Sequence, residues 1–130
     1  MTTQKTNFQT IFLSANMITV DSIIQDMKTW VENDQIVHPS VWLDQCIKLN
    51  VLIGGEHAKL ITLESEIARQ RYTLLKDQNC PVSRAKAIIE AEPIYAQYRT
   101  QKAKITQIEE FIKIAKKYAS LKDDELRNQL

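Results

Sequence analysis

Glycine, proline and cysteine are scarce in this chain of 130 residues, which has two, three and two of them respectively. So few glycines and prolines are not typical of a β-rich or loop-rich fold, where these residues supply the turns. The two cysteines, Cys46 and Cys80, have no CxxC or CxxH neighbour, which argues against a metal site. No run of about 18 apolar residues exists to predict a membrane span, and residues 1–17 do not form a convincing signal peptide. These absences favour a cytoplasmic, helical protein.

Recognisable catalytic motifs are also missing. The sequence contains no GxGxxG, GxxxxGK[ST] or HExxH pattern, and His38 and His57 are its only histidines. Adjacent carboxylates such as Glu109-Glu110 point in different directions on a helix, so they do not form an acid–base pair. We therefore expect no enzymatic activity, no cofactor and no bound metal.

Short apolar segments precede Pro39. Residues 8–20 fit either a short helix or a small β-hairpin, and their periodicity does not decide between the two. Residues 21–33 are expected to form a helix that Thr19 or Asp21 caps. The helix should end before Pro39, and Ser40 can cap the next one.

Two long amphipathic helices are predicted after Pro39, joined at Asn79-Cys80-Pro81. The first has apolar residues at a spacing of three or four, interrupted by Glu56 and Gln70. These residues are Cys46, Leu49, Ile53, Leu60, Leu63, Ile67 and Leu74. The pair Gly54-Gly55 lies within this helix and indicates close packing, a bend or, less often, a functional loop.

The returning helix should be capped by Ser83 and interrupted by Pro93. The predicted fold is thus all-α, a long antiparallel helical hairpin resembling a coiled coil, with one or two short N-terminal helices. Residues 1–38 would form the N-terminal segment, 39–122 the hairpin and 123–130 an acidic tail.

The apolar stripe from Ile94 to Leu121 is broader than a two-helix contact requires. We expect it to pack against the N-terminal helices, another subunit, or both, and self-association is the favoured outcome. The side chains assigned to an oligomer interface are Ile105, Ile108, Phe111, Ile112, Ala115 and Tyr118.

Charge is distributed unevenly, although the whole chain has a net charge of +1. Residues 1–65 carry four Lys or Arg against seven Asp or Glu, whereas residues 66–122 carry twelve against six. Residues 123–130 carry one against three. A basic middle between acidic ends suggests an anionic partner, although many solvated helix faces have similar charges.

Basic residues and one tyrosine gather around the predicted joint. Arg69, Tyr72 and Lys76 lie on one stripe of the helix surface, and Arg71 should also reach solvent. Arg84 and Lys86 begin the returning helix at the same end. Guanidinium groups grip phosphates and a tyrosine ring can stack on an unpaired base, so these six residues are a candidate site for single-stranded nucleic acid.

The stretch Ile67-Ala68-Arg69-Gln70-Arg71-Tyr72 and the following Ser83-Arg84-Ala85-Lys86 resemble the UvsY-type recombination mediators of tailed phages. The resemblance covers about residues 40–120, mainly as a pattern of helices. It implies binding of single-stranded DNA, assembly into a ring-like oligomer, and loading of a RecA-like recombinase in place of a single-strand-binding protein. Arg69, Arg71 and Tyr72 would contact DNA, and the host bacterial cytoplasm would be the location.

A second interpretation remains open. The wide apolar stripe and the lack of a catalytic constellation also suit a coiled-coil scaffold or assembly chaperone of a phage or other large complex.

Overall fold

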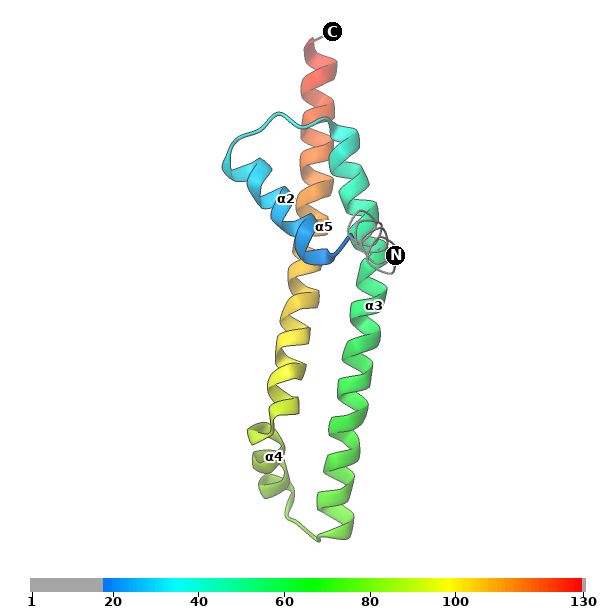
Figure 1. Cartoon of the computed structure of the whole chain (residues 1–130), viewed down its shortest axis with the longest axis vertical. Coiled ribbons are helices and arrows are strands. Elements are labelled where there is room, and N and C mark those ends of the chain that lie inside the picture. The colour runs from blue at the N-terminus through cyan, green and yellow to red at the C-terminus, as the bar shows by residue number, and fades with distance from the viewer. Residues whose placement is uncertain (1–17, 130) are drawn as a thin grey trace, which may run out of the picture. The chain divides into compact units, whose positions relative to one another are not determined.

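The protein is all-α over the residues that the computed structural model describes, 18–129, with side chains described as far as Leu121. The elements are α2 (Val20–Glu32), α3 (Pro39–Tyr72), the π-helix η1 (Thr73–Asp77), α4 (Val82–Ala91) and α5 (Pro93–Gln129). The long helices α3 and α5 run antiparallel and pack together (Figure 1). The predicted helical hairpin is therefore confirmed, and the choice between helix and hairpin for residues 8–17 lies outside the described residues.

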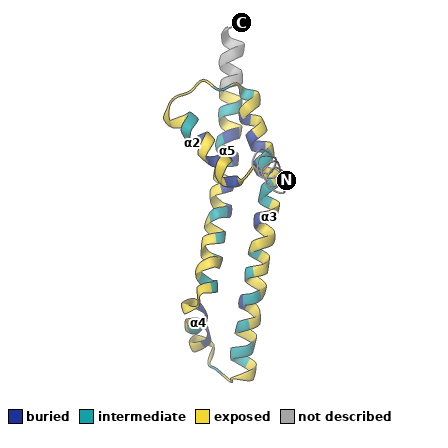
Figure 2. Ribbon diagram, viewed as in Figure 1, coloured by how far each residue is buried: buried dark blue, intermediate teal, exposed yellow. Residues whose placement is uncertain are grey.

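The chain divides into two compact units. Unit 1 comprises Met1–Leu49 and Phe111–Leu130, and unit 2 comprises Asn50–Glu110. Unit 1 contains α2, the beginning of α3 and the end of α5, whereas unit 2 contains the joint and α4. Figure 2 shows buried residues, in dark blue, in both units.

Unit 1 is built around an aromatic cluster. The ring of Trp42 on α3 is stacked on Tyr118 of α5, with centroids 4.8 Å apart. Its edge meets Trp30 of α2 at 5.1 Å and an interplanar angle of 84°. Trp42 is 2% exposed, and Met27 and Leu49 are fully buried. This cluster brings all three helices of the unit into one core.

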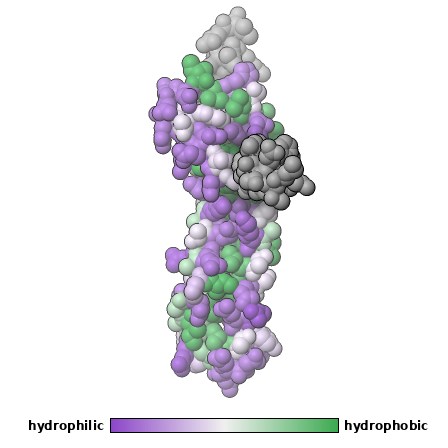
Figure 3. Space-filling view, viewed as in Figure 1, coloured by the Kyte–Doolittle hydropathy of each residue, from purple (hydrophilic) through white to green (hydrophobic). Residues whose placement is uncertain are grey.

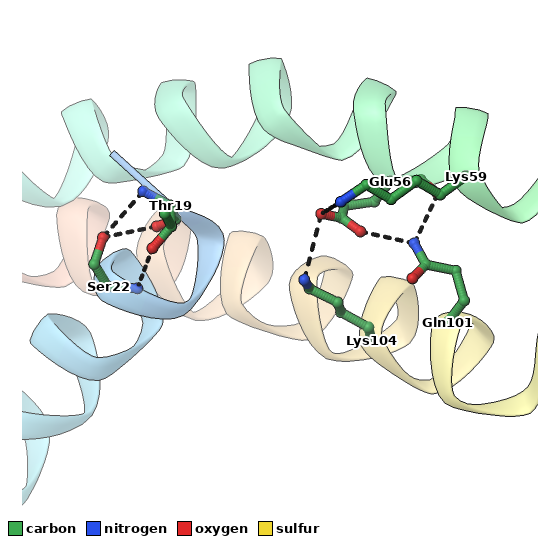
Figure 4. A network of polar contacts seen from close by, with 6 residues as sticks. All are labelled: Thr19, Ser22, Glu56, Lys59, Gln101 and Lys104. Atoms are coloured by element: carbon green, nitrogen blue, oxygen red, sulfur yellow. Dashed lines mark hydrogen bonds and ion pairs between the residues drawn. The ribbon is translucent and has the colours of Figure 1, made fainter. Parts of the chain in front are cut away.

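The N-terminus of α2 is fixed by a reciprocal cap. The Ser22 backbone N–H donates to Thr19 Oγ1 at 3.1 Å, and the Thr19 backbone N–H donates to Ser22 Oγ at 3.2 Å (Figure 4). Two of the donors that a helix start leaves without intrahelical partners are satisfied in this way. The predicted cap at Thr19 is confirmed, and Asp21 lies in the first turn.

The cap predicted at Ser40 is wrong, because α3 begins one residue earlier, at Pro39. The fixed φ angle of proline suits the first helical position. His38 takes the capping role: its Nδ1 accepts a hydrogen bond from the Ser40 N–H at 3.1 Å, and its carbonyl accepts from Val41.

The joint in unit 2 lies where it was predicted. Helix α3 passes into η1, and Asn79 follows with a φ angle of 52°, the left-handed conformation that asparagine tolerates better than most residues. The Cys80 N–H donates to the Leu74 carbonyl at 2.9 Å and closes the turn. Pro81 then directs the chain into α4.

The cap predicted at Ser83 is wrong, whereas the interruption at Pro93 is confirmed. Helix α4 begins at Val82, and the capping position is Pro81, which has no side-chain hydrogen bond to offer. At the other end of α4, Glu92 is extended, as expected for a residue before proline, and α5 starts at Pro93.

Four residues assigned to an oligomer interface belong to the core of the chain itself. Ile105, Ile108, Ile112 and Ala115 are 5%, 0%, 8% and 0% exposed. Such side chains cannot reach a second subunit in this fold, so their assignment is corrected. Phe111 and Tyr118 are half-buried, and both border a cavity in unit 1. The pattern located the stripe correctly but did not reveal that the chain covers most of it.

Gly54 and Gly55 lie inside a continuous part of α3. A Cβ atom added to either glycine would meet nothing within 4 Å. Within the residues that the structure describes, nothing packs closely against the two glycines.

Candidate nucleic-acid interface

Arg69, the first of the predicted contacts, is held by an acid on the same helix. Its Nε donates to Glu66 Oε2 at 3.0 Å, and its Nη2 binds Glu66 Oε1. This hydrogen bonding lowers the pKa of Glu66 and raises that of Arg69. The pair is surface-exposed, so it adds little stability. A phosphate would have to compete with Glu66 for this guanidinium.

Arg71 and Lys86 lie together, as the sequence predicted for the two sides of the joint. Both border a cavity of about 330 Å³ in unit 2. Its aliphatic lining comes from η1 and α4. The other lining residues are Leu75, Val82, Ala85, Ile89, Glu90 and Tyr95.

Two tyrosines of α5 complete the site. Tyr95 and Tyr98 have ring centroids 5.8 Å apart, with an interplanar angle of 38°. Both border a second cavity, of about 290 Å³, that also contains Arg71. Arg71 and Tyr95 are thus shared by the two cavities. We call Arg71, Lys86, Tyr95 and Tyr98 the aromatic-basic site.

A further lysine lies against this site. Lys102 Nζ lies 5.3 Å from the centroid of the Tyr98 ring, within the range of a cation–π contact. The two cavities also include carboxylates, Glu64 in the second and Glu90 in the first. Because these carboxylates offset the basic side chains, a ligand would be bound by stacking on the tyrosine rings as well as by charge.

The remaining predicted contacts do not border these cavities. Tyr72 is 62% exposed, and Lys76 and Arg84 are exposed on η1 and α4. The basic residues Arg71 and Lys86 were thus among the contacts predicted from the sequence, whereas Tyr95 and Tyr98 were not. The sequence feature that could have indicated the two rings is the spacing of Tyr95 and Tyr98, which lie three residues apart just after Pro93 at the start of α5.

A polar cluster around the buried Glu56 side chain in unit 2 ties α3 to α5. Gln101 Nε2 donates to Glu56 Oε2 at 2.7 Å and to the Glu56 backbone carbonyl at 2.8 Å. Lys59 and Lys104 each place Nζ 3.4 Å from Glu56 Oε1 (Figure 4). Burial favours a higher pKa for Glu56, but the Gln101 hydrogen bond and the two lysines outweigh burial and lower it.

This lowered pKa predicts a stability contribution that acid removes. The unfolded chain binds a proton at Glu56 more readily than the folded chain, so stability rises with pH. The contribution is complete above the unfolded pKa of about 4.5 and is lost as pH falls through the lower folded value. We expect Glu56→Gln to lower the free energy of unfolding by about 1–2 kcal/mol at pH 7, and by much less at pH 3.

Urea unfolding at the two pH values measures this difference. Glu64→Gln is a matched control, because Glu64 is an exposed carboxylate on the same helix. An equal loss at both pH values for Glu56→Gln would contradict an ionised, hydrogen-bonded Glu56.

Other kinds of site are not seen in the described part of the chain. No group of three or more His, Cys, Asp or Glu side chains there could hold a metal ion. None of its helices is both long enough and apolar enough to cross a membrane. No protein-family model, curated protein or solved structure matches this chain.

Proposed function

We propose that this protein is a non-enzymatic accessory factor of DNA recombination or replication that binds single-stranded DNA. The observation that carries the proposal is the aromatic-basic site, in which Arg71 and Lys86 lie beside Tyr95 and Tyr98. Exposed bases can stack on tyrosine rings whatever their sequence, and basic side chains follow the phosphates.

The shape of the site favours an unpaired strand over a duplex. Its two cavities are small and adjoin each other, and their rings are only half-buried. A base can enter such a recess only when it is not paired and stacked in a duplex. Arg69, Tyr72, Lys76 and Arg84 lie outside both cavities, and in this proposal they contact only the strand beyond the recess.

The resemblance to UvsY-type mediators extends the proposal to partners. Self-assembly would place several aromatic-basic sites along one strand and raise the avidity for DNA. A RecA-like recombinase would be loaded on that strand in place of a single-strand-binding protein.

Fluorescence anisotropy with a labelled oligothymidylate at several salt concentrations tests the DNA-binding step. We expect Arg71→Ala/Lys86→Ala to weaken binding about tenfold or more. Because each neutralised phosphate of a single strand contributes about 0.7 to the salt slope, the slope should fall by up to about 1.4.

Lys116→Ala/Lys117→Ala is the matched control, since it removes two charges from unit 1 and should change affinity less. Equal losses for both pairs would mean that net charge, not the aromatic-basic site, governs binding. A higher affinity for an RNA of the same sequence would indicate that the protein acts on RNA. The absence of any binding at low salt would refute the proposed binding of single-stranded DNA.

A scaffold or assembly role is the second candidate. Exposed apolar side chains on α3, including Ile47, Val51 and Ile61, favour it because they offer contact surface unrelated to the aromatic-basic site. An ordered oligomer without affinity for nucleic acid would support this role.

A further inference from the structure

The second cavity of the aromatic-basic site has opposite charges at its two ends. Glu64, Ala68 and Arg71 line it from α3, and Tyr95 and Tyr98 line it from α5. The α3 residues are four and three positions apart, so they share one stripe of the helix. Glu64 and Arg71 are about 10 Å apart along the helix axis, which is close to the span of one nucleotide from base edge to phosphate. Ala68 has a small side chain, so the space between the two charged groups stays open.

The fold itself uses neither charged side chain. On the same part of α3, Glu66 and Arg69 bind each other. By contrast, the Glu64 and Arg71 side chains make no hydrogen bond or ion pair with any residue that the structure describes. Both are exposed. A carboxylate and a guanidinium are therefore available to a ligand in the same cavity.

The carboxylate opposes DNA binding unless the DNA donates hydrogen bonds to it. An ionised carboxylate has two acceptor oxygens and no donor, and it repels phosphates. The donors within a single DNA strand are the N–H groups on the edges of its bases. In the arrangement that the charges favour, Glu64 thus lies against a base edge, and Arg71, with Lys86 in the adjoining cavity, lies against the phosphates.

Guanine is the base whose donors match both oxygens of a carboxylate. Its base-pairing edge has N1–H and N2–H side by side, whereas the corresponding donor of adenine, cytosine or thymine adjoins an acceptor that would repel the carboxylate. The cavity, of about 290 Å³, is at the small end of the range for ligand cavities, which suits a single base. In the part of unit 2 that contains α4, Figure 3 shows hydrophobic surface, in green, among hydrophilic side chains. Such mixed surface suits a base, which has apolar faces and polar edges.

We propose that Glu64 makes the aromatic-basic site prefer guanine among the bases of a single strand. The carboxylate accepts hydrogen bonds from N1–H and N2–H, and the base stacks on the tyrosine rings. Arg71 binds phosphate at the other end of the cavity. This inference rests on the proposed function and adds a base preference to it.

Anisotropy titrations with two oligonucleotides of equal length measure the preference. One is oligothymidylate and the other alternates thymidine with guanosine, in a lithium buffer that does not support quadruplexes. We expect the natural chain to bind the alternating strand about five- to tenfold more tightly, in the lower part of the range for a bidentate contact to a base, because the site is exposed to water. Inosine in place of guanosine lacks the N2 amino group and should remove most of the difference.

Glu64→Gln separates base recognition from charge repulsion. Removal of a negative charge would, by electrostatics alone, strengthen binding to every oligonucleotide. We expect instead that affinity for the alternating strand falls about fivefold, because the amide cannot accept both hydrogen bonds, whereas affinity for oligothymidylate does not fall. Glu109→Gln is the matched control: it removes an exposed carboxylate of unit 2 that borders neither cavity and should leave the preference intact.

Ala68→Leu tests the shape of the recess without changing a charge. The larger side chain fills the space between Glu64 and Arg71, so we expect the guanine preference to disappear while the salt slope stays the same. Ala58→Leu makes the same change at an exposed position of α3 that borders neither cavity, and it should keep the preference.

The outcomes distinguish this inference from the proposed function. Equal affinity of the natural chain for the two strands, or tighter binding of both strands by Glu64→Gln, would overturn the guanine preference and leave the binding of single-stranded DNA standing. Absence of binding to every oligonucleotide would refute the proposed function and the preference together.

Discussion

Trp42→Ala should lower the free energy of unfolding by about 3–5 kcal/mol, the range for removing a large buried aromatic side chain. Trp42 is 2% exposed and contacts Trp30 on α2 and Tyr118 on α5. Its loss opens a cavity where three helices meet. Because α2 is only 13 residues long, it depends on such packing rather than on intrinsic helix stability.

Urea unfolding followed by circular dichroism measures the loss, and hydrogen exchange locates it. We expect the amides of α2 to lose protection first. Trp42→Phe is the matched control: it keeps an aromatic ring and removes an indole N–H that finds no hydrogen-bond partner among the described residues. A loss as large for Trp42→Phe as for Trp42→Ala would contradict packing as the main cause.

Tyr98→Ala should weaken binding of single-stranded DNA about tenfold or more, within the range of about 1–3 kcal/mol for a base stacked on an aromatic side chain. Adding Tyr95→Ala should increase the loss, because the two rings adjoin and both border the second cavity. Anisotropy titrations at one salt concentration measure the affinities.

Phenylalanine separates stacking from hydrogen bonding at the same positions. Tyr95→Phe/Tyr98→Phe should bind nearly as well as the natural chain, since the ring faces are retained. The tyrosine variants should leave the salt slope almost unchanged, in contrast to Arg71→Ala/Lys86→Ala. If Tyr95→Ala/Tyr98→Ala bound DNA as tightly as the natural chain, the two rings would not be part of the DNA interface.

The helices were predictable from the sequence because their ends are marked by residues with few conformational choices. Pro93 and the Asn79-Cys80-Pro81 joint stop or start helices wherever they occur, and apolar spacing of three or four residues defines the faces between them. The caps at Ser40 and Ser83 failed for the same reason. Pro39, directly before Ser40, had already begun its helix, and Pro81, two residues before Ser83, had taken the capping position.

The candidate site was only half predictable, because its residues come from three helices. Arg71 and Lys86 were found as charges near the joint, but spacing within α5 does not show which residue of α3 lies opposite Tyr95 or Tyr98. The π-helix η1 adds to this difficulty. Its wider turn changes the direction of the side chains that follow Tyr72, and Leu75 then lines the first cavity.

The sequence also could not predict that the apolar stripe on α5 is buried within the chain itself. An apolar pattern shows that a face needs cover but not what covers it. In this chain α2 and α3 cover Ala115 and its neighbours in unit 1. Exposed apolar side chains also lie on α3, where single residues such as Val51 did not fit the main seam.

The hydrogen-bonded Glu56 has a mechanical consequence for unit 2. If α3 slid by one turn along α5, the carboxylate would lose Gln101 and Lys104 and remain buried without equivalent partners, which is strongly unfavourable. A single polar residue in an apolar seam thus specifies the register of the hairpin, as it does in coiled coils. Arg71 and Tyr98 lie further along the same two helices, so a fixed register would preorganise the recess that they line for the proposed single strand.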